Sequence, residues 1–180
     1  MNKNTETILE KLRDKKVGIF ADDSNLFHAF RKNGWRVDFK KLKKLFSNYC
    51  DLRFINYHLA VPDKDDENFS RTEKFINKIG KDVVLKKKDL KYISVGTKKD
   101  RVVKKADVDV EIVLDVVRNI DKLDFVIIMS GDSDYLELKN YVVYDKRKKI
   151  LFMGYEENMA WELRQCLHIY LNRIKEFISL

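Results

Sequence analysis

The sequence predicts an α/β fold, a three-layer sandwich in which helices flank a mainly parallel central sheet of about five strands. Two observations lead to this prediction. Short apolar segments rich in β-branched and aromatic residues alternate along the chain with longer segments of helical periodicity. The chain also holds only six glycines and one proline in 180 residues, so the elements follow one another closely. A single domain over residues 1–180 is therefore expected.

Each expected element has its own signal. The strands are short runs rich in Val, Ile, Leu and Phe, at residues 16–21, 52–60, 82–87, 125–130 and 150–154. The helices show apolar residues three and four positions apart, at residues 25–31, 38–49, 67–79, 108–120, 135–145 and 161–178. Between Leu90 and Val103, the sequence LKYISVGTKKDRVV predicts a short hairpin or an extended basic arm.

The composition favours a protein of the cytoplasm. No run of about 18 uncharged apolar residues is present, and the first 16 residues are polar and of mixed charge. These features argue against a membrane protein and against an exported one. Cys50 and Cys166 lack the spacing of a zinc site and are too few for a disulfide framework, which fits a reducing compartment.

A basic segment at residues 86–105 holds nearly all of the excess positive charge. The whole chain carries +8, and this segment has nine basic and two acidic side chains, a balance of +7. Apart from Lys91, its basic residues are the candidates for nucleic-acid binding: Lys86, Lys87, Lys88, Lys98, Lys99, Arg101, Lys104 and Lys105. Clustered cations gain from counterion release on a phosphate backbone, whereas a solvated lysine-rich face is the alternative interpretation.

Carboxylates follow two of the expected strands. The first strand ends in Asp22 and Asp23, and the fourth runs into Asp132 and Asp134. The carboxyl ends of parallel strands meet at one edge of a sheet, where ligands bind. Helix capping is the structural alternative: it accounts for Asp134, and for Asp23 or Ser24, better than for Asp22 and Asp132.

The helix expected at residues 108–120 supplies a third acidic cluster. At about 100° per residue, Asp109 falls inside the apolar stripe, while Asp115 falls on the side that faces water. Asp107 is expected to cap this helix. An ionised side chain on a buried face is costly unless a partner compensates it, and a shared divalent cation does so well. Asp109 is thus the stronger candidate from geometry, and Asp115 the weaker one.

Four carboxylates would then converge at the sheet edge: Asp22, Asp109, Asp132 and Asp134. Oxygen-only ligands favour Mg²⁺ or Mn²⁺ over zinc, and such a site suits phosphodiester hydrolysis. The three histidines lie outside these clusters and are interpreted as ordinary packing or surface residues.

With these motifs assembled, the chain resembles the NYN domain, the LabA-like (DUF88) branch of the PIN-like nuclease superfamily. The first strand of that family carries a pattern close to F-I-D-G-x-N-L, matched by FADDSNL at residues 20–26. The central helix of the family carries two aspartates six positions apart, matched by Asp109 and Asp115. The fourth strand leads into S-G-D-x-D-F, matched by SGDSDY at residues 130–135. A lysine that usually precedes the helical aspartate is matched by Lys104 or Lys105.

This resemblance implies a metal-dependent ribonuclease with a PIN-like, Rossmannoid fold. It implies Asp22, Asp109, Asp132 and Asp134 as Mg²⁺ or Mn²⁺ ligands, with Asn25 and Ser130 as supporting polar groups. It also raises Asp115 above its rank from the helical wheel. Two departures from the family pattern are Asp23 in place of glycine and Tyr135 in place of phenylalanine.

Two functions of different classes follow. The leading one is a Mg²⁺- or Mn²⁺-dependent endoribonuclease whose basic segment holds the RNA backbone, with DNA as an alternative substrate. The other is an RNA-binding or scaffolding module that keeps the fold without meaningful turnover. The intact acidic set favours the enzyme, because carboxylates near phosphate would weaken a pure binder. The oligomeric state stays open, with a homodimer as one option.

Overall fold

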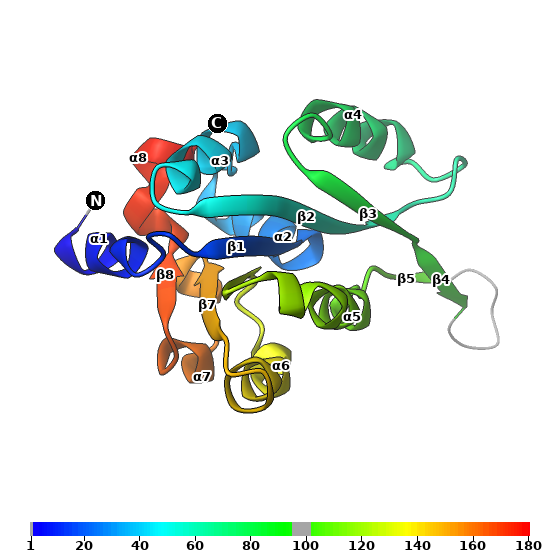
Figure 1. Ribbon diagram of the computed structural model, residues 1–180. Coiled ribbons are helices and arrows are strands. Elements are labelled where there is room, and N and C mark those ends of the chain that lie inside the picture. Colours follow the sequence, from blue (N-terminus) through cyan, green and yellow to red (C-terminus); the bar gives the residue numbers. More distant parts are fainter. Residues whose placement is uncertain (1, 95–101) are drawn as a thin grey trace.

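A six-stranded parallel sheet forms the centre of the molecule. The computed structural model describes residues 2–94 and 102–180. The strands lie in the order β3-β2-β1-β6-β7-β8, and every neighbouring pair is parallel (Figure 1). The predicted fold class is therefore confirmed. The sheet has one strand more than the five expected.

The elements lie close to their predicted positions in most of the chain. The strands are β1 (Lys16–Asp22), β2 (Asp51–Val61), β3 (Val84–Asp89), β4 (Lys91–Ser94), β5 (Val102–Lys105), β6 (Phe125–Met129), β7 (Lys149–Gly154) and β8 (His168–Tyr170). The α-helices are α1 (Lys3–Glu10), α2 (Asp23–Asn33), α3 (Phe39–Ser47), α4 (Phe69–Ile79), α5 (Asp109–Asn119), α6 (Leu136–Asn140), α7 (Trp161–Arg164) and α8 (Lys175–Ile178). Within the described residues, no helix is both long and apolar enough to cross a membrane.

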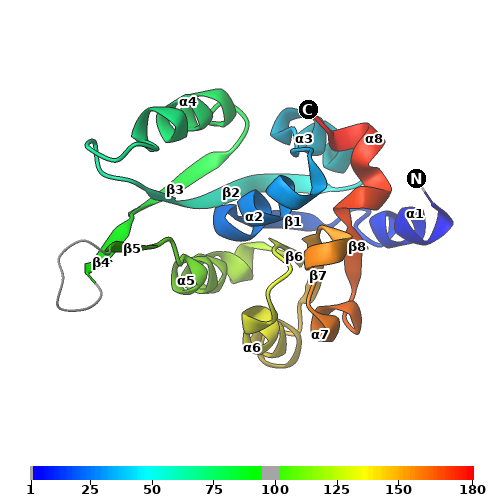
Figure 2. The ribbon, with the colours of Figure 1, turned by 180° about the vertical axis from the view of Figure 1, so that it is seen from behind.

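Helices cover both faces of the sheet. One core forms where α1, α2, α3, α4 and α8 pack on the first face, and it includes Leu9, Leu42 and Ile178. The second core forms under α5, α6 and α7 and includes Ile112, Leu138 and Leu163. Figures 1 and 2 show the two groups of helices on opposite sides of the strands. Burial on both faces explains why β1 and β6 are almost continuously apolar.

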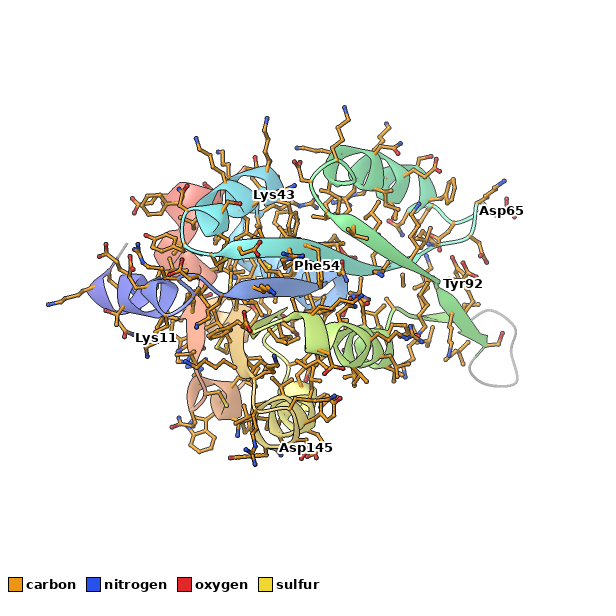
Figure 3. The ribbon with its side chains drawn as sticks, in the orientation of Figure 1. Lys11, Lys43, Phe54, Asp65, Tyr92 and Asp145 are labelled. Atoms are coloured by element: carbon orange, nitrogen blue, oxygen red, sulfur yellow. The ribbon has the colours of Figure 1, made fainter. Side chains whose placement is uncertain are left out.

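Close packing under the centre of the sheet requires glycine at position 18. A Cβ atom at Gly18 would lie 2.8 Å from Leu123 Cδ1 and 2.9 Å from the Phe54 ring. Phe54 lies on β2 (Figure 3), and its ring contacts Phe20 edge to face at 5.5 Å between centroids. The β1–β2 register also shifts between Val17 and Gly18. Glycine at this point lets the two strands and the second core approach one another.

The predicted long helix at residues 161–178 is wrong. The segment divides into α7, the short strand β8, a 3-10 turn at Leu171–Ile174 and α8. β8 pairs with β7 and becomes the sixth strand of the sheet. Leu163, Leu171, Ile174 and Ile178 are buried at spacings that also suit a helix, so periodicity could not separate a helix from this mixed segment. Helix α1, which the sequence did not predict, begins where Asn2 accepts a hydrogen bond from the Thr5 backbone N–H at 2.9 Å.

The predicted hairpin is present in the described part of the basic segment. β4 and β5 form a separate antiparallel pair beyond the end of β3 (Figure 1). Tyr92 on β4 donates to Asp66 at 2.8 Å, which ties this pair to the loop before α4 that also holds Asp65 (Figure 3). The candidates Lys86, Lys87 and Lys88 belong to the edge strand β3 instead. Lys98, Lys99 and Arg101 lie outside the described residues.

Candidate active site

The candidate site lies at the switch point of the sheet, between β1 and β6, where the chain stops adding strands on one side of β1 and starts adding them on the other. From β1 the chain builds β2 and β3 on one side of the sheet, then β6, β7 and β8 on the other. Asp22 is the last residue of β1, and the pairing of Ala21 with Met129 places Ser130 beside it. Loops part in opposite directions at such a point and leave a crevice outside the strand ends, which is a common binding site.

Asp22 is buried and held at both carboxylate oxygens. Its side chain is 1% exposed. Oδ1 accepts from Ser24 Oγ at 2.8 Å and from the Asn25 backbone N–H at 3.2 Å, and Oδ2 accepts from Ser130 Oγ at 3.1 Å. Asp22 is thus the N-cap of α2. The expectation that Ser24 or Asp23 caps this helix is wrong, because the helix begins directly after β1 with no intervening turn.

Asp23 turns to the other face of the sheet. Its carboxylate accepts a hydrogen bond from the Tyr57 hydroxyl on β2. Burial raises the pKa of Asp23 to about 6, and the neighbouring Asp22 adds to this effect, while the Tyr57 hydrogen bond and Arg36 oppose it. The residue that replaces the family glycine therefore has its own partner and does not join the Asp22 site.

Asp109 and Asp22 share one hydroxyl group. Tyr135 donates to Asp109 Oδ1 at 2.8 Å, and its oxygen lies 3.5 Å from Asp22 Oδ2. Burial raises the pKa of Asp109 to about 6; the charge of Asp22 acts in the same direction and the Tyr135 hydrogen bond against it. Asp109 turns toward the sheet edge, as predicted. Burial and the nearby charges of Asp22 and Asp109 also raise the pKa of Tyr135 well above its usual value.

The SGDSDY motif contributes supporting contacts. Ser130 Oγ accepts from the Asp132 backbone N–H at 3.2 Å, and Asp132 Oδ1 accepts from the Asp134 backbone N–H at 3.0 Å. Asp132 therefore caps the 3-10 turn at Ser133–Tyr135, and the prediction that Asp134 is the cap is wrong. Asp134 is exposed at the surface. Asn25 Oδ1 accepts from the Gly131 backbone N–H at 2.9 Å and joins α2 to this loop.

Asp115 does not face water, contrary to the prediction from the helical wheel. It is only 5% exposed, and its neighbours Ile112 and Val116 on α5 are fully buried, whereas Val110 and Val117 are 66% and 40% exposed. The buried face thus lies about a quarter turn from the predicted one. The prediction failed because two exposed apolar residues, Val110 and Val117, shifted the apparent stripe. Asp109 and Asp115 lie on opposite sides of the buried stripe that Ile112 and Val116 form on α5.

Asp115 belongs to a second polar cluster, over β2 and β3. Its Oδ2 accepts from Asn56 Nδ2 at 2.6 Å and lies 3.1 Å from His58 Nε2. Its Oδ1 accepts from Asn119 Nδ2 at 3.0 Å and lies 3.6 Å from Lys86 Nζ. The sequence did not identify Asn56 and His58 as partners. Their alternation on β2 was the available signal, because positions two apart point to the same face of a sheet.

Ion pairs with carboxylates neutralise most of the described candidate lysines. Lys87 is the exception among the five within the described ranges. The pairs are Lys86–Asp115 at 3.6 Å, Lys88–Glu111 at 2.7 Å, Lys104–Asp66 at 2.9 Å and Lys105–Asp107 at 3.0 Å. The local balance of +7 counted along the sequence therefore overstates the unpaired positive charge. The prediction that Asp107 caps α5 is wrong: Val108 holds the N-cap position, and Asp107 only accepts from the Asp109 backbone N–H at 3.3 Å.

The donor set at the switch point suits a small, oxygen-preferring cation. Within the described ranges, neither Asp22 nor Asp109 forms an ion pair with a basic side chain. The same residues contain no group of three or more His, Cys, Asp or Glu side chains that could hold a metal ion. Mg²⁺ often takes one or two protein carboxylates and completes its shell with water and substrate phosphate. The Asp22–Asp109 pair fits that mode of binding and does not form a closed site.

Comparisons with known proteins agree with this architecture. The chain is 28% identical over 169 residues to the low amplitude and bright protein LabA of Synechococcus elongatus, an alignment that covers 93% of this chain and 89% of LabA. Its structure is similar to the crystal structure of VPA0982, a Vibrio parahaemolyticus protein of unknown function, with a TM-score of 0.68 and 20% identity. That similarity covers 92% of this chain and 97% of the other, and it shows a shared fold. The family model of the NYN domain matches residues 16–172, so the chain belongs to the NYN domain family.

Proposed function

We propose that the protein is a Mg²⁺- or Mn²⁺-dependent endoribonuclease. The Asp22–Asp109 pair is the observation that carries this proposal. One carboxylate is buried and the other half-buried, both lie within reach of one hydroxyl, and neither has a cationic partner among residues 2–94 and 102–180. Such an arrangement is unfavourable unless a proton or a cation joins it. The NYN family match adds independent support for a nuclease.

The chain's own residues have distinct proposed roles. Asp22 and Asp109 would hold the metal, and Asp132 and Asp134 of the SGDSDY motif are the further candidate ligands. When bound, the ion would neutralise charge that grows on the scissile phosphate and lower the pKa of the attacking water. Ser130 and Asn25 are positioning residues: Ser130 fixes Asp22 Oδ2, and Asn25 fixes the Gly131 backbone. Lys87 and the β4–β5 hairpin would contact the RNA backbone.

Cleavage of RNA labelled at both ends tests the proposal. Internal products should appear with Mg²⁺ or Mn²⁺ and disappear when EDTA removes the metal. Asp22→Asn should abolish these products. Asp145→Asn, at an acidic residue on the far side of α6 (Figure 3), is the matched control and should cleave like the wild type. Cleavage that survives both EDTA and Asp22→Asn would contradict the proposal.

One observation favours a second candidate, an RNA-binding module without turnover. The described residues lack a prebuilt set of three metal ligands, which a pure binding domain would not need. That module would bind RNA with and without metal and leave it intact. The same assay therefore separates the two candidates, because only the nuclease produces internal fragments.

A further inference from the structure

A large pocket opens on the opposite face of the sheet from Asp109. It has a volume of about 830 Å³, and residues of α2, β2 and α4 form most of its lining. Six aromatic side chains and five basic ones line it, together with two acidic ones, Asp66 and, at its inner end, Asp23. Pockets of this size hold a nucleotide or a drug-sized molecule. Asp23 follows Asp22 directly in the chain, so the pocket begins next to the candidate cleavage site.

Two arginines of this pocket lie over aromatic rings. The Arg36 guanidinium lies 3.9 Å from the centre of the Phe30 ring and 5.7 Å from that of Phe75. Arg71 on α4 lies 6.0 Å from the centre of the Phe27 ring on α2. Planar guanidinium and aromatic groups arranged in this way present flat faces with positive charge at their edges. Unpaired nucleobases stack on such faces, and the phosphates that flank them are attracted by the charge.

Asp23 and Tyr57 give the inner end of the pocket a polar recognition group. The Tyr57 hydroxyl donates to Asp23 Oδ1, so Oδ2 can accept a further hydrogen bond. Tyr57 is itself 2% exposed and packs edge to face against Phe39 and Phe75, at 5.0 and 5.8 Å between centroids. Packing on both sides fixes the position of this pair. A carboxylate oxygen held in this way suits the N–H groups on the edge of a nucleobase.

We propose that this pocket binds an unpaired base of the RNA strand, one or two nucleotides from the bond that is cut. The proposal rests on the nuclease function and narrows its substrate to single-stranded or looped RNA. The base would stack on Phe27 and Arg71, and Asp23 would accept a hydrogen bond from an N–H group on the edge of the base. Duplex RNA keeps its bases stacked inside the helix and cannot enter the pocket.

Binding measured without metal tests this proposal separately from cleavage. In EDTA, the fluorescence anisotropy of a labelled single-stranded RNA is compared with that of a duplex and of an abasic strand with the same number of phosphates. Phe27→Ala should weaken binding of the single strand by about tenfold, because loss of one base stack costs that much, and should leave the abasic strand within twofold. Phe27→Tyr should retain binding. Phe177→Ala, at an exposed ring on α8, is the control.

A second variant keeps the test decisive if Phe27→Ala does not fold. Arg71 is exposed on α4, so Arg71→Ala should fold and still weaken single-stranded binding, whereas Arg53→Ala at the start of β2 should not. Equal losses for single-stranded and abasic RNA, or no loss for either pocket variant, would overturn the proposal. A protein that binds as expected here yet never cleaves RNA would contradict the nuclease function alone.

Discussion

Two aspartates of helix α5 lie in opposite electrostatic environments. Burial and the charge of Asp22 raise the pKa of Asp109 to about 6. Burial also acts to raise the pKa of Asp115, but hydrogen bonds from His58 and Asn56 and the charge of Lys86 bring it below the usual value. Among the described residues, Asp109 thus has no basic partner, whereas Asp115 has hydrogen-bond donors and a lysine beside it. We infer from this difference that Asp109 is placed to bind a ligand and Asp115 to stabilise the fold.

The largest expected effect follows from removing the charge of Asp109. Asp109→Asn should reduce metal-dependent RNA cleavage by at least about 100-fold, because loss of even an outer partner of a metal costs 10- to 100-fold. Single-turnover cleavage at saturating Mn²⁺ measures this. Asp121→Asn, at an exposed acidic residue after the same helix, should cleave within twofold of the wild type. An active Asp109→Asn would place the metal elsewhere.

Asp115→Ala should mainly change stability. It leaves the buried Asn56 and His58 without their acceptor, so the free energy of unfolding should fall by about 2–3 kcal/mol. Urea denaturation measures this loss. Cleavage per folded molecule, at a temperature where the variant stays folded, should remain within about threefold of the wild type. A fully stable variant that cannot cleave would make Asp115 part of the catalytic site, as the family resemblance implies.

Tyr135→Phe restores the residue usual in the family and should change the pH dependence of cleavage. The Tyr135 hydrogen bond lowers the pKa of Asp109, so its loss should raise that pKa further. Less of the ionised carboxylate is then present near pH 6, and cleavage there should fall more than at pH 8. Rates measured from pH 5.5 to 8.5 check this. An identical pH profile for the two proteins would show that the hydroxyl does not influence Asp109.

The smallest expected effect concerns stability in the absence of metal. A carboxyl group whose pKa is raised in the folded state binds more protons there than in the unfolded state, so stability falls as pH rises from about 4 through 6. Asp109→Asn removes the contribution of Asp109 to this dependence and leaves that of Asp23, whose pKa is also raised to about 6. In EDTA, the melting temperature of the variant should exceed that of the wild type more at pH 7.5 than at pH 5. A larger difference at pH 5 would contradict the raised pKa.

Most of the fold could be predicted from the sequence, since buried parallel strands are nearly continuous apolar runs. Strand β8 could not, because a three-residue strand gains its identity from pairing with β7. The candidate site was predicted in outline: Asp22 and Asp109 lie together, with Ser130 and Asn25 in support. Asp134 was predicted to be the cap, whereas Asp132 is the cap in the structure. A sequence pattern cannot locate the start of a helix to one residue.

The partners of the charged groups were the least predictable feature. The count over residues 86–105 could not include Asp66 or Asp115, which are distant in sequence and reach Lys104 and Lys86 only through the fold. The phase of α5 failed for a related reason. Val110 and Val117 are apolar but exposed, and only the packed structure shows which side of the helix the sheet covers.

Direct binding of Mn²⁺ tests the central claim that Asp22 and Asp109 form the metal site. Electron paramagnetic resonance reports free Mn²⁺, and its signal decreases as the protein binds the ion. The wild type and Asp115→Asn should both bind Mn²⁺, while Asp22→Asn and Asp109→Asn should leave the free-ion signal unchanged. Undiminished binding by Asp109→Asn, or a loss of binding confined to Asp115→Asn, would contradict the account.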